Sequence, residues 1–235
     1  MNDLLATAVA AHGGLDRWNR IRAIRAGAAI TGAFWQAKGK SDAMKDVRFE
    51  VDTTRERLTM DYAGRRPRSV FEPGRVVLQG PDGTVVDARD DPERAFDGHG
   101  FQTPWDDLHL AYFTGEALWT YLMTPFLFTW PGFACEELSP VESDGETWRR
   151  LKVTFPGHIK SHSRDQVFCF GPDGLLRRHD FTIDIVDPDT ESQLHAAGYR
   201  DIDGIVVPAT RRAYATTGED RVVLVAIDLA GISFR

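Results

Sequence analysis

Cysteine is scarce in this chain, which has only Cys135 and Cys169 among its 235 residues. The two lie far apart in the sequence and match none of the spacings that are typical of metal sites or redox motifs. The cysteine content therefore excludes a zinc-finger or thioredoxin-like role. We expect both thiols to lie in the core of the protein.

Long apolar runs are missing as well. The most apolar segment, residues 106–123, is interrupted by His109, Glu116 and several threonines, whereas a membrane-spanning helix needs about 20 uninterrupted apolar residues. The first residues include Asp3 and carry no basic cluster, so they do not match a secretory signal. The sequence predicts no membrane span and a cytoplasmic location.

Several motifs of cofactor binding and catalysis are absent. The chain has no Gly-x-Gly-x-x-Gly after a strand, no Gly-Lys-Ser/Thr phosphate loop, no Gly-x-Ser-x-Gly elbow and no His-Glu-x-x-His. These motifs are typical of dinucleotide and nucleotide binding, serine hydrolases and zinc proteases. The sequence therefore disfavours all four classes, and we expect no cofactor.

Positive charge is in deficit. The 28 Lys and Arg residues face 35 Asp and Glu residues, for a formal net charge of −7. The arginines form short doublets, such as Arg177-Arg178 and Arg211-Arg212, in place of the continuous basic stripe that nucleic-acid binding requires. We interpret the doublets as solvated faces and expect no nucleic-acid partner, although an arginine pair can also bind one carboxylate or phosphate of a small ligand.

Alternating hydrophobicity is what the chain has in abundance. From Ile21 onward, every second residue is apolar: Ile24, Ala26, Ala28 and Ile30 alternate with Arg25, Gly27, Ala29 and Thr31. This pattern indicates a long strand with one buried face. Similar runs recur at intervals of about 10 residues and are separated by turn sequences such as Pro81-Asp82-Gly83. The later strand-like runs are 47–51, 57–62, 68–72, 75–78, 85–88, 147–155, 166–170, 175–185, 193–199, 206–214 and 222–232.

The strands and the remaining segments together predict a mainly β protein of the α+β class. We expect one domain, residues 1–235, with a large curved antiparallel sheet of about 10–11 strands that forms an open half-barrel. A short helix at about 3–11 precedes the sheet, and an insertion at 96–133 contains a longer, nearly all-apolar helix. We expect helices to cover the concave face, leaving a trough that side chains or a ligand must fill.

Two segments add a family resemblance to this pattern. The N-terminal helix that ends in Ala11-His12-Gly13-Gly14-Leu15-Asp16-Arg17-Trp18, and the hairpin at 168–176, resemble the LolA/LolB-like superfamily of lipoprotein carriers. The resemblance implies a half-barrel around a hydrophobic cavity that accepts acyl chains, with helices acting as a lid. The chain departs from the family pattern because it has neither a signal peptide nor a lipid-attachment cysteine near its start.

One face of the inserted helix carries ionisable and aromatic side chains together. His109, Tyr112, Glu116 and Trp119 fall at i, i+3, i+7 and i+10, which places them on one side of a helix. A buried glutamate needs a partner, and its raised pKa would make it a general acid or base. The alternative is a structural hydrogen bond from Glu116 to Tyr112, to His109 or to a strand residue.

The second group of candidate residues lies on the predicted strands after residue 160. If 171–174 is a tight turn, Gln166 pairs with His179 and His162 pairs with Ile183, so the two histidines lie about 13 Å apart on one face. That face is apolar and includes Phe181, so His179 is either a core histidine or, with Gln166, a polar anchor in a ligand pocket.

The same arithmetic places a third histidine beside a carboxylate. A turn centred on 188–189 pairs Thr182 with His195, which sets His195 diagonal to Asp180. Such a pair either orients a general base or is an ordinary surface pair. Three histidines spread in this way make a metal site improbable, because zinc requires its ligands at about 2.1 Å from one point.

The sequence supports two leading hypotheses of function. The first is binding of an apolar or amphipathic small molecule, lipid-like or a hydrophobic metabolite, in the half-barrel cavity. The second is a cofactor-free isomerase, cyclase or lyase in which Glu116 and one histidine, His109, His162, His179 or His195, move a proton in a dry pocket. A structural role through an exposed apolar face ranks third, and the sequence indicates no oligomeric state. An all-carbon pocket favours binding, and a carboxylate within about 5 Å of an imidazole across a cavity favours catalysis.

Overall fold

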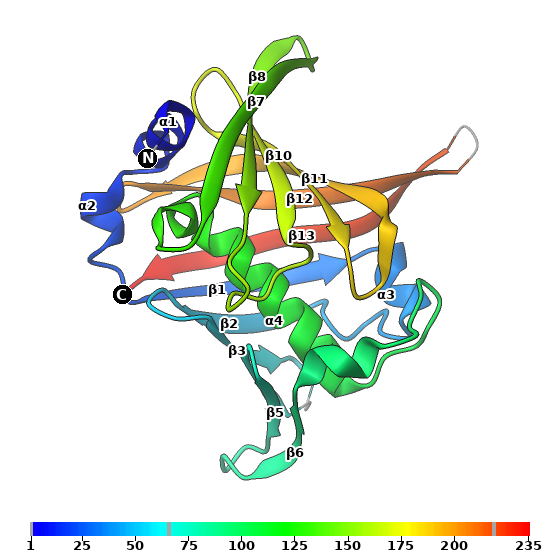
Figure 1. Ribbon diagram of the computed structural model, residues 1–235. Helices are drawn as coiled ribbons and strands as arrows, with labels where there is room; N and C mark the ends of the chain where they lie inside the picture. The colour runs from blue at the N-terminus through cyan, green and yellow to red at the C-terminus, as the bar shows by residue number, and fades with distance from the viewer. Residues whose placement is uncertain (1, 65–66, 218–219) are drawn as a thin grey trace.

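The strands of the protein form a single curved antiparallel sheet that does not close on itself (Figure 1). The computed structural model describes residues 2–64, 67–217 and 220–235. Helix α4 (Asp107–Met123) crosses the concave side of the sheet, between the upper and lower ends that curl forward in Figure 1. The expected half-barrel with a helix on its inner face is therefore confirmed.

Within the described residues, the sheet has thirteen strands in the order β6-β5-β4-β3-β2-β1-β13-β12-β11-β10-β9-β8-β7. Two meanders, β1 to β6 and β7 to β13, are joined where β1 pairs with β13 at the centre. The strands are β1 (Ala23–Thr31), β2 (Val47–Asp52), β3 (Arg57–Tyr62), β4 (Arg68–Glu72), β5 (Arg75–Gln79), β6 (Val85–Asp90), β7 (Ala134–Ser143), β8 (Glu146–Thr154), β9 (Asp165–Phe170), β10 (Leu176–Ile183), β11 (Asp187–Ile202), β12 (Ile205–Thr217) and β13 (Asp220–Phe234).

The other helices are short. The N-terminal α1 (Asp3–Ala11) packs against β8 at one end of the sheet, where His12 follows it as the C-cap. None of the helices in the described part of the chain is long and apolar enough to cross a membrane. The remaining helical segments are α2 (Leu15–Trp18), α3 (Ala33–Ala37) and the 3₁₀ turns η1 (Pro92–Phe96) and η2 (Phe126–Thr129).

The sequence of helix α4 allows it to pack closely against the sheet. Its N-cap Asp106 accepts a hydrogen bond from the backbone N–H of His109 at 2.8 Å, which satisfies one of the free amides of the first turn. Every residue from Leu108 to Met123 is buried. Gly115 allows the helix to approach β4, since a Cβ there would lie 2.3 Å from Cγ of Phe71.

One strand of the structure was not expected from the sequence. β7 forms an edge of the sheet, and most of its side chains are exposed on both faces. A strand without a buried face shows no apolar alternation, and Pro140 within it further weakens the pattern. Its position also explains why Cys135 is half-buried and not a core thiol, whereas Cys169 of β9 is buried.

The predicted strand registers after residue 160 were wrong. His179 pairs with Phe168, not with Gln166. The turn is one residue longer than predicted, so Phe170 pairs with Leu176, and a bulge between Leu176 and Arg178 shifts β10 by one more residue against β9. His195 pairs with Arg178, not with Thr182. The turn into β11 falls at 184–186, and β11 is bulged at 188–190, where Pro188 has no N–H to give to the ladder.

Candidate functional site

An apolar cavity of about 120 Å³ lies between α4 and the inner face of the sheet. Most of its walls are carbon, and they are built by five strands of the sheet (β1 and β10 to β13), by α3 and by one face of α4. The cavity can form because small alanines stand where larger side chains would fill the trough. Its apolar lining includes Ile30, Phe113, Ala117, Leu118, Leu194 and Ala213.

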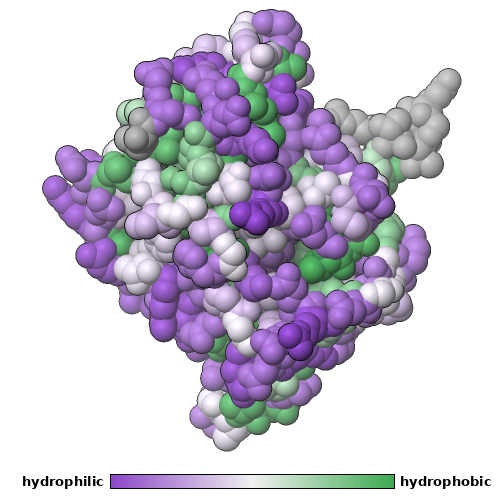
Figure 2. Space-filling model, in the orientation of Figure 1, coloured by the Kyte–Doolittle hydropathy of each residue, from purple (hydrophilic) through white to green (hydrophobic). Residues whose placement is uncertain are grey.

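The cavity reaches the surface near α3 and the turn between β10 and β11. Phe34 of α3, Phe101 and Val186 line this side together with the polar Asp187 and Thr190. Phe101 is 36% exposed, so it forms part of the rim. Figure 2 shows a hollow of hydrophobic surface on the right-hand side of the molecule, where Figure 1 places α3 and the β10–β11 turn.

Two hydrogen-bonded polar side chains stand in the wall of this cavity. The hydroxyl of Tyr121 lies 2.7 Å from Nε2 of His162, and both residues line the cavity. The imidazole of His162 is held between the rings of Phe113 and Phe181, at 5.0 and 4.7 Å between ring centroids. Its backbone carbonyl accepts a hydrogen bond from the N–H of Asp184, which ties the loop before β9 to the end of β10.

Behind His162 lies the carboxylate of Glu116. Its Oε1 is 2.8 Å from Nδ1 of His162, and the two side chains are only 2% and 3% exposed. Neither atom makes a well-aligned hydrogen bond within the described residues, so the two groups lie close together without being hydrogen-bonded. Polar atoms buried at this cost without full satisfaction occur most often at functional sites.

A second, polar cleft of about 180 Å³ opens on the far side of His162. Glu116, Tyr112 and His162 line it together with Glu93 and Lys160, which form an ion pair. His162 thus belongs to both the apolar cavity and the polar cleft. Glu116 lines only the cleft.

A buried cation lies behind Tyr121. One terminal nitrogen of Arg211 donates to the backbone carbonyl of Tyr121 at 2.8 Å, and the guanidinium lies 5.1 Å from the centroid of the Tyr121 ring. Burial lowers the pKa of Arg211 to about 10. Burial also raises the pKa of Tyr121 above its ordinary value, so its phenol keeps its proton.

Arg211 corrects one interpretation of the basic doublets. It was expected on a solvated face, but it is 3% exposed. The reason is the period of the strand: Ala209, Arg211 and Ala213 alternate onto the inner face of β12, and the same face carries all three into the core. Its neighbour Arg212 points outward and pairs with Asp228 at 2.5 Å.

His179 and Gln166 form a separate polar pair in the core. Nε2 of His179 lies 2.5 Å from Oε1 of Gln166, and Nε2 of Gln166 donates to the carbonyl of Ser163 at 2.6 Å. The His179 ring stacks on Phe168 at 4.2 Å between centroids, and burial lowers its pKa well below its ordinary value. The pair does not line the apolar cavity, although Phe181 between the two histidine rings does.

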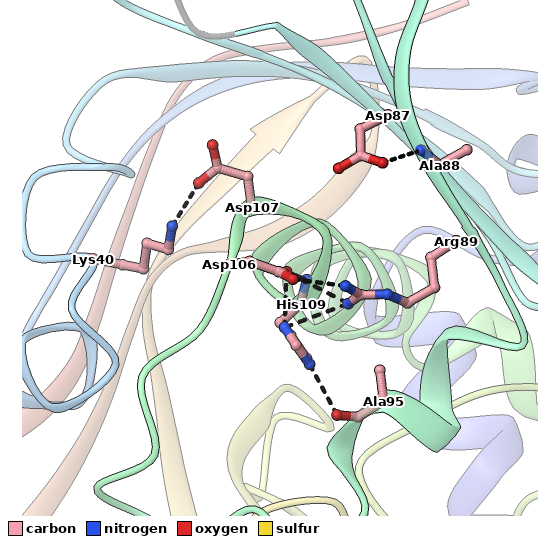
Figure 3. A network of polar contacts seen from close by, with 8 residues as sticks. All are labelled: Lys40, Asp87, Ala88, Arg89, Ala95, Asp106, Asp107 and His109. Carbon is pink, nitrogen blue, oxygen red and sulfur yellow. Dashed lines mark hydrogen bonds and ion pairs between the residues drawn. The ribbon is translucent and has the colours of Figure 1, made fainter.

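His109 belongs to the N-terminal end of α4 and not to the cavity wall (Figure 3). Its Nδ1 lies 2.7 Å from Asp106 Oδ1, and its Nε2 lies 2.9 Å from the carbonyl oxygen of Ala95. Arg89 binds the same Asp106 at 2.6 Å. The structure therefore does not bring His109 to Glu116, two helical turns away, and it gives His109 the task of fixing η1 to α4.

The other predicted residues of α4 divide between packing and the polar cleft. Trp119 donates from its indole N–H to the carbonyls of Asp52 and Arg55, at 2.9 and 3.0 Å, and so fixes α4 to the β2–β3 turn. Tyr112 packs on Phe71 at 5.7 Å between centroids and lines the cleft beside Glu116. Neither residue lines the apolar cavity.

Asp180 and His195 lie away from the cavity. Both carboxylate oxygens of Asp180 accept hydrogen bonds from the guanidinium of Arg178, at 2.6 and 2.8 Å. The His195 ring packs against Tyr214 at 6.1 Å between centroids. Within the ranges that the structure describes, no group of three or more His, Cys, Asp or Glu side chains is placed to hold a metal ion.

Comparisons with known proteins show the fold. No protein-family model matches the chain, and a search of curated proteins finds no match. A LolA superfamily protein from Nitrosomonas europaea superposes with a TM-score of 0.51 at 9% identity, over 97% of this chain and 92% of that chain. A domain described as an outer membrane lipoprotein-sorting protein from Vibrio parahaemolyticus gives 0.52 at 12% identity, over 100% and 94%. The expected LolA-like fold is confirmed.

Proposed function

We propose that this protein binds an apolar or amphipathic small molecule, lipid-like or a hydrophobic metabolite, in the cavity between α4 and the sheet. The observation that carries the proposal is the carbon-lined space of about 120 Å³ with two hydrogen-bonding side chains, Tyr121 and His162, in its wall. Small-molecule sites have this composition, with apolar walls and a few placed polar groups.

The energetics favour an apolar occupant. Each Å² of apolar surface that leaves water contributes roughly 25 cal/mol, on both the ligand and the lining. An anionic ligand is disfavoured, because the described residues that line the cavity include Asp187 and no lysine or arginine. The best fit is therefore a hydrocarbon body with one uncharged oxygen that faces Tyr121. A longer chain has room to leave through the rim beside Phe101.

The fold supports the same proposal. The domain from Vibrio parahaemolyticus is described as a lipoprotein-sorting protein, and it shares this arrangement of sheet and helix. A half-barrel with a helix on its inner face leaves a trough that a ligand can occupy. Since fold alone does not determine function, the cavity itself provides the test.

The experiment is titration of the protein with the neutral fluorophore N-phenyl-1-naphthylamine, which brightens in apolar surroundings. We expect a saturable increase in fluorescence with the wild type. Ala117→Phe adds a ring inside the cavity and should weaken binding at least tenfold, whereas Ala29→Phe adds the same ring on the exposed face of β1 and should leave binding unchanged. Circular dichroism of each variant checks folding.

A second cavity-filling variant keeps the proposal testable if Ala117→Phe does not fold. Ala213→Phe fills the cavity from the opposite wall, on β12. Equal binding by the wild type and by both cavity-filling variants would contradict the proposal. Native mass spectrometry of the protein purified from cells would then show whether any small molecule co-purifies, and its mass would identify the ligand class.

A second function, cofactor-free catalysis by an isomerase, cyclase or lyase, is favoured by one distance. Glu116 Oε1 lies 2.8 Å from His162 Nδ1, well within the separation expected of an acid–base pair beside a cavity. Binding remains the primary proposal, because catalysis requires a ligand in the same space.

A further inference from the structure

Three side chains stand in a row that runs from the wall of the apolar cavity to the polar cleft. His162 lies between the phenol of Tyr121, 2.7 Å from Nε2, and the carboxylate of Glu116, 2.8 Å from Nδ1. The order carboxylate, imidazole, hydroxyl is the one in which an imidazole accepts a proton while the carboxylate stabilises its charged form. Two of the three residues, Glu116 and Tyr121, come from α4, and His162 comes from the loop before β9.

One end of the row faces the polar cleft, and the other end faces the apolar cavity. Tyr121 and His162 line the apolar cavity, where a ligand would touch them. Glu116 and His162 line the polar cleft, which also contains the ion pair of Glu93 with Lys160. A proton on His162 can therefore exchange with solvent through the cleft while the ligand stays in the apolar cavity.

The distances assign a role to each group. In the tautomer with its proton on Nδ1, His162 directs that N–H at the Glu116 carboxylate 2.8 Å away, and Nε2 accepts the hydrogen bond of the Tyr121 hydroxyl. If a ligand oxygen takes over the hydrogen bond from Tyr121, Nε2 becomes free to act as a base. The packing of Phe113 and Phe181 on both faces of the imidazole holds it in place for this exchange of partners.

We propose that the Glu116–His162–Tyr121 row enolises a neutral, apolar carbonyl compound bound in the cavity. Nε2 of His162 removes a proton from the carbon next to the carbonyl, and the C–H electron pair forms the carbon–carbon double bond of the enolate. The phenol of Tyr121 donates a hydrogen bond to the oxygen, which now carries the negative charge. The proton returns from His162 to the same carbon, or to a conjugated carbon in a double-bond isomerisation.

This step needs no oxidant, reductant or cofactor, since every atom and electron stays on the substrate or on His162. It rests on the proposed function, because the carbonyl compound must first enter the cavity. A carboxylic acid substrate is disfavoured, since its negative charge would lie near that of Glu116. Tyr121 and His162 are the catalytic residues, and Glu116 is a positioning residue that acts through His162.

The experiment follows the exchange of α-protons of cyclohexanone in D₂O by proton NMR. We expect the wild type to exchange these protons faster than buffer alone. Tyr121→Phe and His162→Gln should each reduce the protein-dependent rate about a hundredfold, in line with the loss of one acid–base group. The matched control is Tyr62→Phe, which removes the hydroxyl that bonds Ser69 at 2.9 Å, away from the cavity, and should leave the rate within about twofold.

Binding is measured separately by displacement of N-phenyl-1-naphthylamine with cyclohexanone or with methylcyclohexane, which has no carbonyl. Tyr121→Phe should weaken cyclohexanone about fivefold and leave methylcyclohexane unchanged, which also shows that the variant is folded. Glu116→Gln should lower the exchange rate about tenfold without changing the affinity for cyclohexanone, a separation that a merely structural role would not produce.

The outcomes separate the two proposals. If cyclohexanone displaces the fluorophore but exchanges no faster than in buffer, enolisation is overturned and ligand binding stands. If Tyr121→Phe exchanges as fast as the wild type, the assigned role of the row is likewise overturned. If cyclohexanone does not displace a fluorophore whose binding Ala117→Phe weakens, enolisation of this ketone is overturned and ligand binding stands. If the fluorophore binds the wild type and both cavity-filling variants equally, the binding proposal fails and enolisation fails with it.

Discussion

Glu56 is a buried carboxyl group with an incomplete set of partners. Its Oε2 accepts a hydrogen bond from the backbone N–H of Lys160 at 2.9 Å, while its Oε1 has no hydrogen-bond partner within the described residues. Burial, together with a smaller effect of the nearby Glu116, raises the pKa of Glu56 to about 9. The carboxyl group is therefore neutral in the folded protein at pH 7.

The pH dependence of stability should follow from this group. Because the folded pKa of about 9 exceeds the unfolded value of 4.5, the folded state holds a proton that the unfolded state releases. The contribution to stability is complete below pH 4.5 and is lost as the pH rises towards 9. We expect Glu56→Gln to be more stable than the wild type by up to about 5 kcal/mol at pH 8 and by little at pH 4.5.

Urea unfolding of both proteins at several pH values between 4.5 and 9 measures this difference. The matched control is Glu72→Gln, a half-exposed carboxylate of β4 that pairs with Arg57 at 3.1 Å, and it should show no such gain. A Glu56→Gln difference that stays constant across the pH range would show that Glu56 ionises normally in the folded state.

At the residue scale, the sequence could predict that Glu116 is buried but not which residue it contacts. Helical periodicity grouped it with His109, Tyr112 and Trp119, and the partner came from outside the helix. Tyr121, five residues further along α4, falls outside that helical face, so it was missed. His162 and Glu116 meet only because the loop before β9 folds back over α4, and no local pattern encodes that contact.

At the scale of elements, the approach of α4 to β4 depends on one glycine. A Cβ at Gly115 would lie 2.3 Å from Cγ and 2.4 Å from Cβ of Phe71, distances that require the helix or the strand to move. Phe71 itself is fully buried. The position of α4, and with it the height of the cavity, is therefore set by this contact.

Whether Gly115→Ala stabilises or destabilises the protein tests the close contact between Gly115 and Phe71. In an ordinary helix, Gly→Ala stabilises by about 1 kcal/mol. Gly115→Ala should instead destabilise the protein by about 1–3 kcal/mol, because overpacking outweighs the gain in helix propensity. Thermal or urea unfolding measures it, and in a Phe71→Leu background the same substitution should cost less. A stabilised Gly115→Ala protein would disprove the close contact.

Most of the elements that the sequence predicted well have one buried face. β1 to β5 appear where period-two alternation places them, and α4 lies where its apolar sequence begins and ends. The edge strand β6 was predicted from its apolar start after the turn at 81–83, although none of its side chains is buried. β7 was missed because its mostly exposed side chains show no apolar alternation. The bulges were missed because extra residues, one in β10 and three in β11, change every later pairing and leave the sequence pattern almost unaltered.

At the scale of the whole molecule, the sheet ends in two edges. β6 forms one of them, and its neighbouring Val85 and Val86 are 60% and 63% exposed. An unpaired strand edge with apolar side chains favours pairing with another strand. We expect the protein to associate weakly through this edge at high concentration.

A charge on the edge should prevent that association. Val86→Lys should lower the concentration dependence of the sedimentation coefficient, because lysine on an edge strand opposes pairing. Gln36→Lys adds the same charge on exposed α3, away from the edge, and should sediment as the wild type does. Identical sedimentation of all three proteins at all concentrations would exclude the edge as an association site.

The architecture could be predicted from the sequence, but the cavity could not. Alternation along each strand indicates an inner face, and the resemblance of the N-terminal segment indicates a half-barrel. The volume of the cavity depends on how residues as distant as Ile30, Phe113 and Ala213 fill the same space. Packing of this kind is a property of the assembled molecule.

The pairing of β1 with β13 at the centre of the sheet has a consequence for folding during synthesis. Ile24 of β1 pairs with Phe234 of β13, so nearly the whole chain separates two neighbours in the sheet. On the ribosome, β1 must wait with an open backbone edge until the last strand emerges, and contacts so distant in sequence form slowly. We expect a nascent chain of this kind to bind chaperones until β1 has paired with β13.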